Sequence, residues 1–164
     1  MKPPCPLDNQ HDRSSFDCGY SELNEYLQRF AGQNQTKGSA RTYVVLDGER
    51  VVAYYTLVVG SVEWKDCPDD VRKGLGRYPV PVIVIGRLAV DRRFQRKGLG
   101  IGLIKDAFAR SLQVSDLVGV VAILVDAKDE QAKNYYESKR LGFKSMPGEP
   151  LKLYLPIKVI RANF

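Results

Sequence analysis

The chain has 164 residues, of which 44% are hydrophobic and 27% charged, and its formal net charge at neutral pH is +6. This length predicts a single domain over residues 1–164, and the composition excludes a disordered or fibrous chain. There is neither a run of about 18 apolar residues nor the apolar core of a signal peptide, so we expect a cytoplasmic protein without membrane contact.

Cysteine and histidine are sparse. Cys5, Cys18 and Cys67 have no C-x-x-C spacing, which argues against a disulfide framework and a zinc site. The single histidine, His11, stands in a polar segment and is expected at the surface, so no metal is predicted. A nucleophilic pair of His11 with Cys18 or Cys5 is the alternative.

The first half of the chain predicts a helix followed by a β-hairpin. Apolar residues recur at helical spacing from Leu23 to Phe30, in a helix that begins near Cys18. Residues 41–46 and 51–59 are rich in β-branched and aromatic side chains and flank Asp47-Gly48, a strong turn signal. Residues 64–81 are rich in charge, glycine and proline and predict a long loop.

The second half alternates strands and helices. Val82–Val90 is almost continuously apolar and predicts a central strand buried on both faces, in which Gly86 indicates a bulge or a close backbone approach. A helix with an apolar face follows over residues 99–112, and Val118–Val125 predicts the next strand. The remaining elements are a helix capped by Asp129, carrying Tyr135, Tyr136 and Lys139 and ended by Gly142, and closing strands at residues 143–145 and 151–155.

The junction between Val90 and the following helix has the character of an anion site. Gly98, Gly100 and Gly102 lack a Cβ and allow a tight turn, after which the free N–H groups of a helix start and its dipole favour a phosphate group. The neighbouring Arg96 and Lys97 add positive charge. Because no P-loop or dinucleotide-binding motif is present, the pattern indicates a different pyrophosphate site.

Gln95-Arg-Lys-Gly-Leu-Gly100 resembles the acetyl-CoA signature Q/R-x-x-G-x-G/A of the GNAT superfamily of N-acetyltransferases. Ala132-Lys-Asn-Tyr-Tyr136 followed by Leu141-Gly-Phe143 is similar to a second segment of that family, at the expected distance. The resemblance covers most of the chain. It implies an α/β (α+β) GNAT fold, with a central mixed, mostly antiparallel sheet flanked by helices.

The resemblance also implies the binding of acetyl-CoA. The backbone of strand residues 88–90 would pair with the pantetheine arm, and the loop would hold the pyrophosphate. The implied cofactor-binding residues are Leu88, Ala89, Val90, Gln95, Arg96, Lys97, Gly98, Leu99, Gly100, Ile101, Asn134 and Tyr136.

Tyr136 is the expected catalytic residue. Its phenol has an ordinary pKa of about 10 and can protonate the departing CoA thiolate; the alternative, a packed core aromatic, fits Tyr135 better. Residues 82–90 contain no carboxylate that could act as a base. An α-amino group, with a pKa of about 8, needs less help than a lysine, which favours an α-amine substrate. Glu63, Asp66, Asp69 or Asp91 could still act through a water.

Several segments, among them Phe16-Asp-Cys-Gly19 and Gly86-Arg-Leu-Ala-Val-Asp91, resemble the GNAT toxins of bacterial type II toxin–antitoxin modules. This resemblance implies acetylation of the α-amino group of aminoacyl-tRNA, which blocks translation. It further implies a ribbon-helix-helix antitoxin, binding of operator DNA only through the complex with that antitoxin, and a homodimer.

A tRNA substrate gives the positive charge a role, because Lys and Arg contacts to phosphates supply much of the affinity for nucleic acids. The candidate tRNA-binding residues are Arg29, Lys37, Arg41, Arg77, Arg87, Arg92 and Arg93. The alternatives are a GNAT enzyme acting on a small amine or a protein N-terminus, and a non-catalytic binding module.

Overall fold

The computed structural model describes all 164 residues. Two compact units are formed, one by Met1–Val58 with Gly86–Ala107 and the other by Val59–Ile85 with Phe108–Phe164. The three longest elements, β3 (Arg50–Val62), β4 (Val80–Val90) and α4 (Leu99–Ser115), run through both units.

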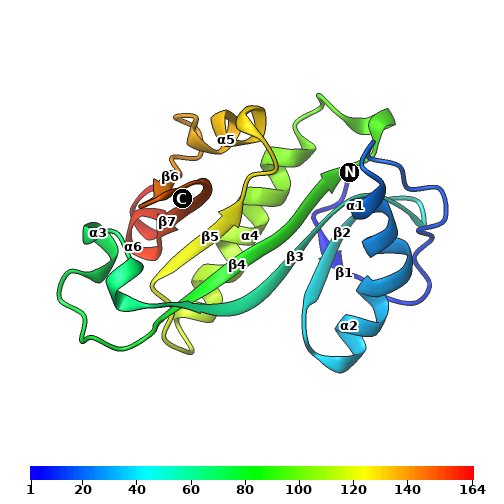
Figure 1. Ribbon diagram of the computed structural model, residues 1–164. Helices are drawn as coiled ribbons and strands as arrows, with labels where there is room; N and C mark the ends of the chain where they lie inside the picture. Colours follow the sequence, from blue (N-terminus) through cyan, green and yellow to red (C-terminus); the bar gives the residue numbers. More distant parts are fainter. The chain divides into compact units, whose positions relative to one another are not determined.

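Seven strands form one sheet in the order β1-β2-β3-β4-β5-β7-β6 (Figure 1). β4 and β5 are parallel, whereas the pairs β1–β2, β2–β3, β5–β7 and β6–β7 are antiparallel. This confirms the expected mixed, mostly antiparallel sheet with flanking helices. The remaining strands are β1 (Cys5–Pro6), β2 (Arg41–Asp47), β5 (Ala122–Asp126), β6 (Lys144–Met146) and β7 (Glu149–Pro156).

The helices of the first unit are α1 (Ser21–Glu25), the π-helix η1 (Tyr26–Phe30), α2 (Ala31–Lys37) and the 3-10 helix η3 (Arg92–Phe94). The second unit contains the 3-10 helix η2 (Trp64–Asp66), α3 (Asp69–Arg72), α5 (Glu130–Glu137) and α6 (Ile157–Asn163). None of the helices has the length and apolar character needed to cross a membrane.

In the first unit, the helical segment differs from the prediction at its start. It begins at Ser21 rather than near Cys18 and continues through the π-helix to Lys37, where Gly38 ends it with a φ of +79°. The π-helix is a local widening in which the Ala31 N–H bonds to the Tyr26 carbonyl, five residues earlier. Periodicity alone does not separate such a turn from an ordinary α-helix.

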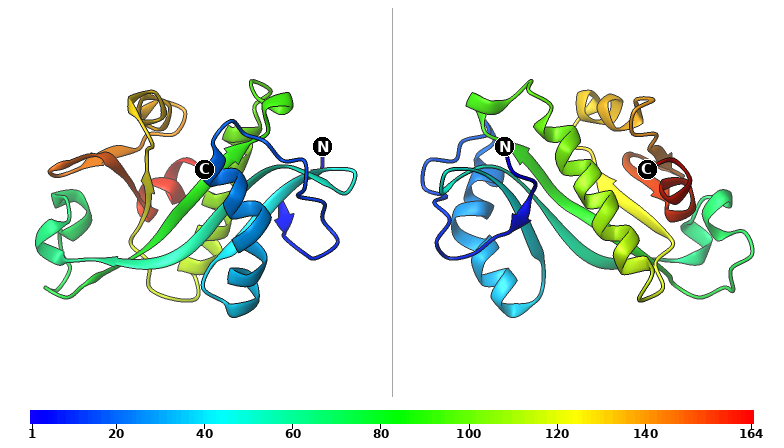
Figure 2. Two further views of the ribbon diagram at one scale, coloured as in Figure 1. Left: turned by 45° about the vertical axis from the view of Figure 1, so that its right-hand side comes forward. Right: turned by 180° about the vertical axis from the view of Figure 1, so that it is seen from behind.

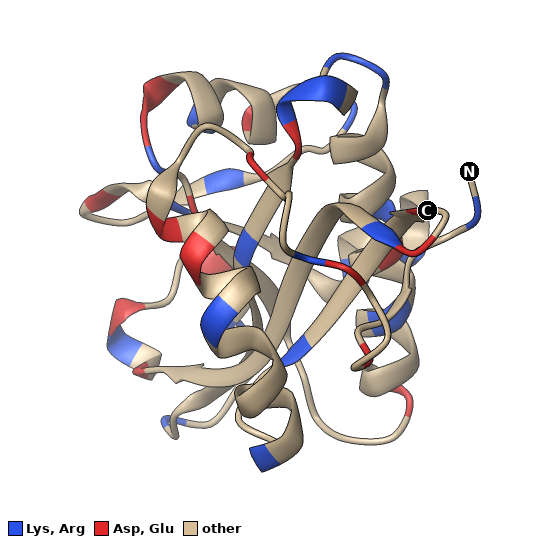
Figure 3. Cartoon of the chain, turned by 90° about the vertical axis from the view of Figure 1, so that its right-hand side faces the viewer, with Lys and Arg blue, Asp and Glu red and all other residues tan.

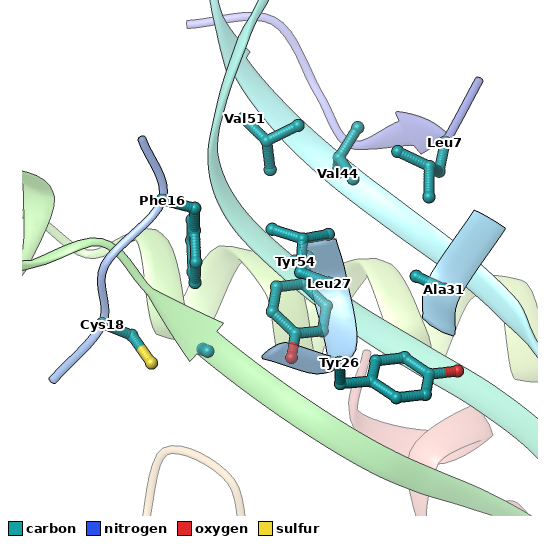
Figure 4. Close-up of a cluster of buried hydrophobic side chains, with 10 residues drawn as sticks. Leu7, Phe16, Cys18, Tyr26, Leu27, Ala31, Val44, Val51 and Tyr54 are labelled. Carbon is teal, nitrogen blue, oxygen red and sulfur yellow. The ribbon is translucent and has the colours of Figure 1, made fainter. Parts of the chain in front are cut away.

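The same segment packs on the β2–β3 hairpin (Figure 2). Leu27, Val44 and Tyr54 are fully buried in a cluster that also includes Phe16 and Tyr26 (Figure 4). The buried Tyr54 hydroxyl donates a hydrogen bond to the Leu23 carbonyl at 2.7 Å, so its polar group is satisfied. The predicted hairpin is confirmed, although its two turn residues are Gly48 and Glu49, since Asp47 still pairs with Arg50.

In the second unit, three predicted boundaries are wrong. Residues 64–81 contain η2 and α3 rather than a plain loop. β5 begins at Ala122, because the exposed Val118 bonds through its N–H to the Val114 carbonyl and closes the end of α4. α5 ends at Glu137, which leaves Lys139 outside it, and Gly142 takes its positive φ in the turn that follows.

The core of the second unit lies around β5 and β7, and includes Val82, Leu124 and Tyr154. The two closing strands, predicted in the sequence, are confirmed as β6 and β7. Helix α6 was not predicted. It begins directly after Pro156 and buries Ile157 and Ile160 (Figure 2). With 7 residues, the helix is too short to show a helical period of apolar residues in the sequence.

Candidate functional site

Strand β4 changes character at Gly86. It pairs with β5 over Val82–Ile85 only, and from Gly86 onward its residues are exposed or half-buried, except Ala89. The prediction of a strand buried on both faces is therefore wrong for its second half. A close approach at Gly86 is confirmed, because a Cβ there would lie 2.9 Å from Thr56 Oγ1. Leu88, Ala89 and Val90 thus lie beyond the stretch that pairs with β5, and an extended ligand can bond to their backbone groups on that edge.

The loop after β4 turns through two left-handed residues. Arg96 has a φ of +63°, the only positive value outside glycine, and Gly98 has a φ of +84°. α4 then begins, and its first bond is from the Gly102 N–H to the Gly98 carbonyl, so the N–H groups of Leu99, Gly100 and Ile101 have no partner within the helix. Since Gln95, Arg96, Lys97 and Gly98 are exposed, this loop has the donors and charge that a pyrophosphate requires.

Only one of the three glycines is needed for this turn. Gly100 and Gly102 lie inside α4 and have no positive φ, and a Cβ on Gly102 would meet nothing within 4 Å. The expectation that all three glycines shape the turn is therefore wrong for these two.

This difference provides a test. We expect Gly98→Ala to raise the Kd for acetyl-CoA about tenfold, because a left-handed conformation costs an L-residue roughly 1–2 kcal/mol. Gly102→Ala makes the same chemical change within a helix and is the matched control, for which we expect no change. Calorimetric titration with acetyl-CoA measures both, and equal Kd values for the two variants would contradict this role of Gly98.

A buried carboxylate anchors the start of the loop. Asp91, with a side chain only 1% exposed, accepts hydrogen bonds from the backbone N–H groups of Asp17 and Arg93 at 3.1 and 2.9 Å. Its oxygens also accept two bonds of 3.0 Å from the Arg93 guanidinium. These bonds from Arg93 and Asp17 outweigh burial and lower the pKa of Asp91 to about 2. Asp91 is therefore committed to holding the loop and is not a base.

Gln95 also holds the start of this loop in place. Its side-chain amide donates to the carbonyls of Val90 at 2.8 Å and Cys18 at 3.2 Å. It therefore ties the loop to β4 and to the N-terminal segment instead of pointing its amide N–H groups toward a ligand. The sequence motif contained Gln95 but did not indicate this role.

Tyr136 lies on α5, which Asp129 caps by accepting a bond from the Ala132 N–H at 2.8 Å, as predicted. Tyr136 is 7% exposed, and its ring packs edge-to-face against that of Phe143, with ring centroids 5.5 Å apart. Tyr135 is 38% exposed, so the expectation that Tyr135 is the more core-like of the two is wrong. Burial raises the pKa of Tyr136 above its ordinary value, and the phenol keeps its proton at neutral pH. Asn134 is exposed on the same helix.

Basic and acidic residues are interspersed along the chain (Figure 3). The seven candidate tRNA-binding residues differ in their surroundings. Three of them are held by carboxylates: Arg29 by Glu25, Arg92 by Asp17 and Arg93 by Asp91. Two lie over aromatic rings, Arg87 over Tyr26 at 3.6 Å and Arg77 over Trp64 at 5.0 Å. Lys37 and Arg41 line a pocket in the first unit.

His11 does not behave as a surface residue. Its side chain is 9% exposed, its Nδ1 accepts a hydrogen bond from the Asp8 N–H at 3.1 Å, and its Nε2 lies 3.6 Å from the Asp8 carboxylate. The Cys18 sulfur faces the Tyr20 carbonyl at 3.6 Å. The geometry therefore gives no support to a Cys–His nucleophile.

Comparisons with known proteins agree with this arrangement. The Acetyltransferase (GNAT) family profile matches residues 8–143. The chain is 40% identical to a "tRNA-acetylating toxin" of Mycobacterium tuberculosis, over 97% of this chain and 94% of that protein. The solved structure of AtaT complexed with acetyl-methionyl-tRNAfMet is 29% identical, with a TM-score of 0.89 over 97% of this chain and 96% of that chain.

The complex of AtaT with its antitoxin AtaR is a further match. One structure of it contains acetyl-CoA and has a TM-score of 0.80, with 30% identity over 97% of this chain and 95% of that chain. Another contains DNA and has a TM-score of 0.79, with 29% identity over 98% of each chain.

Proposed function

Because the chain belongs to the acetyltransferase (GNAT) family, we propose that it is a toxin that acetylates the α-amino group of an aminoacyl-tRNA, with acetyl-CoA as the donor. The observation that carries the proposal is the 40% identity, over nearly the full length of both chains, to a tRNA-acetylating toxin. The loop before α4 suits a pyrophosphate. The candidate residues without a carboxylate partner, Lys37, Arg41, Arg77 and Arg87, suit a polyanion.

In this reaction the α-nitrogen bonds to the thioester carbonyl carbon, the carbon–sulfur bond breaks, and the nitrogen loses a proton to water. We infer that the backbone of Leu88–Val90 aligns the pantetheine arm and that the N–H groups at the start of α4 hold the pyrophosphate. Tyr136 acts as the general acid for the departing thiolate, supported by its buried, protonated phenol.

No carboxylate of β4 is needed as a base in this reaction. Residues 80–90 contain no acidic side chain, and Asp91, which follows them, is paired with Arg93. An α-amino group titrates near ~8, so a useful fraction is neutral at physiological pH without a protein base. This favours an α-amine acceptor over a lysine side chain.

The proposed partners follow from the same relatives. Structures of AtaT in complex with its antitoxin AtaR are known, and one of them also contains DNA. We infer that this chain is neutralised by an antitoxin of the ribbon-helix-helix type, that it reaches operator DNA only within that complex, and that it forms a homodimer. A charged tRNA is a cytoplasmic substrate, which makes the cytoplasm the expected compartment.

The test is transfer of labelled acetyl from acetyl-CoA to a pool of charged tRNAs, with uncharged tRNA and a panel of free amines and peptides as parallel acceptors. We expect label on the charged pool, released by mild base as an N-acetyl amino acid that identifies the acceptor. Label only on free amines or peptide N-termini would contradict the proposal and favour a small-amine or N-terminal acetyltransferase. Failure to bind acetyl-CoA would favour a non-catalytic module.

A further inference from the structure

A polar pocket with a volume of about 450 Å³ lies in the first unit, between the end of α2, the start of β2 and the segment after β1. Three cationic side chains line it, Arg13, Lys37 and Arg41, and its only acidic residue is Asp8. Asp8 contacts His11 rather than these cations. The pocket therefore carries an excess of positive charge. Arg13 had no signal in the sequence that set it apart from other surface arginines.

None of the three cations has a carboxylate partner within 4 Å. Arg13 donates to the Leu27 carbonyl at 3.3 Å, and Arg41 to the Gln35 carbonyl at 3.5 Å. Most other arginines are paired with acids: Arg29, Arg50, Arg72, Arg92, Arg93 and Arg161. Three unpaired like charges around one cavity repel one another, and an anionic ligand removes that repulsion.

The local backbone holds Arg13 in position. In the π-helix, Ala31 bonds to Tyr26 instead of Leu27, which leaves the Leu27 carbonyl able to accept the bond from Arg13. Gly32 then gives the guanidinium room, since a Cβ there would lie 3.2 Å from Arg13 Nη1. Only one nitrogen of the fork is used, so most of its five donors remain for a ligand.

The walls of the pocket are connected to one another. The Gln35 amide donates to the Leu7 carbonyl at 2.6 Å and accepts from the Thr42 N–H at 2.8 Å. The carbonyls at the end of α2 are covered, because the Gly38 and Ser39 N–H groups bond to Gln35 and Asn34. The negative end of the helix is therefore partly satisfied and opposes an anion less.

We propose that this pocket binds a backbone phosphate of the tRNA substrate, with Arg13, Lys37 and Arg41 as its ligands. The inference rests on the proposed function, which makes tRNA the polyanion that this chain has to hold. Guanidinium forks match the geometry of phosphate oxygens, and a cavity of this size admits a phosphate with its adjoining sugar. The pocket thus contributes affinity without reading the sequence of the RNA.

The test compares Arg13→Gln, Lys37→Gln and Arg41→Gln with a matched control, Arg50→Gln, whose arginine is paired with Asp47 outside the pocket. We expect each pocket variant to weaken tRNA binding about tenfold and to lower the slope of log Kd against log salt by about one. Arg50→Gln should bind tRNA as the parent does, and all four variants should keep the parent's Kd for acetyl-CoA.

Gly32→Ala tests the pocket without removing a charge. Alanine favours the helix, yet its Cβ crowds the Arg13 guanidinium, so we expect a folded protein with a two- to threefold weaker affinity for tRNA. The pocket proposal is overturned if Gly32→Ala keeps the parent's affinity for tRNA and the three pocket variants lose no more affinity than Arg50→Gln. Binding would then depend on the overall positive charge.

The same preparations separate this proposal from the proposed function. If the parent acetylates charged tRNA and the three pocket variants keep their tRNA affinity, only the pocket proposal fails. If the variants lose affinity for the antitoxin alone, the pocket belongs to the antitoxin, which also overturns it. If the parent labels no charged tRNA in any salt condition, the proposed function itself fails.

Discussion

Tyr136→Phe is expected to lower the rate of acetyl transfer about 100-fold while leaving the Kd for acetyl-CoA nearly unchanged. The substitution removes one hydroxyl from a ring that is packed against Phe143 and keeps the volume of the ring. Without the phenolic proton, the thiolate must leave unprotonated or take a proton from water, and general acids typically contribute 10²–10⁴-fold. Burial raises the pKa of Tyr136, which keeps that proton in place across the neutral range.

The matched control is Tyr135→Phe. This substitution removes the same hydroxyl group from the adjacent residue, which is far more exposed. We therefore expect a rate of acetyl transfer within about twofold of the parent's. Single-turnover transfer to charged tRNA separates the chemical step from product release. Equal rates for Tyr136→Phe and the parent would remove Tyr136 from the mechanism and leave a water as the proton donor.

The second large effect is expected from Asp91→Ala, which should lower the free energy of unfolding by about 3 kcal/mol. The buried carboxylate accepts hydrogen bonds from the part-buried N–H groups of Asp17 and Arg93 and from the Arg93 guanidinium. Donors that lose such a partner cost roughly 1–3 kcal/mol. For a chain of this length we expect the melting temperature to fall by roughly 6–12 °C. Because the loop of Arg96 and Gly98 starts here, the Kd for acetyl-CoA should rise as well.

The stability that Asp91 contributes should depend on pH. Its pKa is about 2 in the folded chain, against about 3.9 in an unfolded one. A depressed pKa stabilises the folded state above the unfolded value, and this contribution is lost as the pH falls from about 4 to 2. Denaturant titrations of the parent and Asp91→Asn should therefore converge over that range. If the two proteins still differ by the same free energy of unfolding at pH 2, the charge of Asp91 does not contribute to stability.

Asp47→Ala is the control for the second prediction. Asp47 forms an exposed ion pair with Arg50 at 3.4 Å on the β2–β3 hairpin, and exposed pairs contribute little. We expect its melting temperature to stay close to that of the parent. A comparable loss for Asp47→Ala and Asp91→Ala would mean that the stability of the first unit does not depend specifically on the buried carboxylate.

Local patterns in the sequence determined which elements form and what family they resemble. The β2–β3 hairpin, the Asp129 cap and the glycine turn before α4 depend on a few adjacent residues, because turns and caps are set by local backbone preferences. The acetyl-CoA motif at Gln95–Gly100 is equally local. Such features can be read from one chain, and here they led to the correct fold class and family.

Tertiary structure decided the features that depend on residues far apart in the chain. Three of these features have no local signal. They are the change from buried to exposed residues at Gly86 in β4, the bond from the Asp17 N–H to Asp91, and the burial of Tyr136 rather than Tyr135. The π-helix and the placement of Arg13 against Gly32 are of the same kind. A side chain's partners are set by packing across the fold, so a basic residue that is paired and one that is open to a ligand look alike in the sequence.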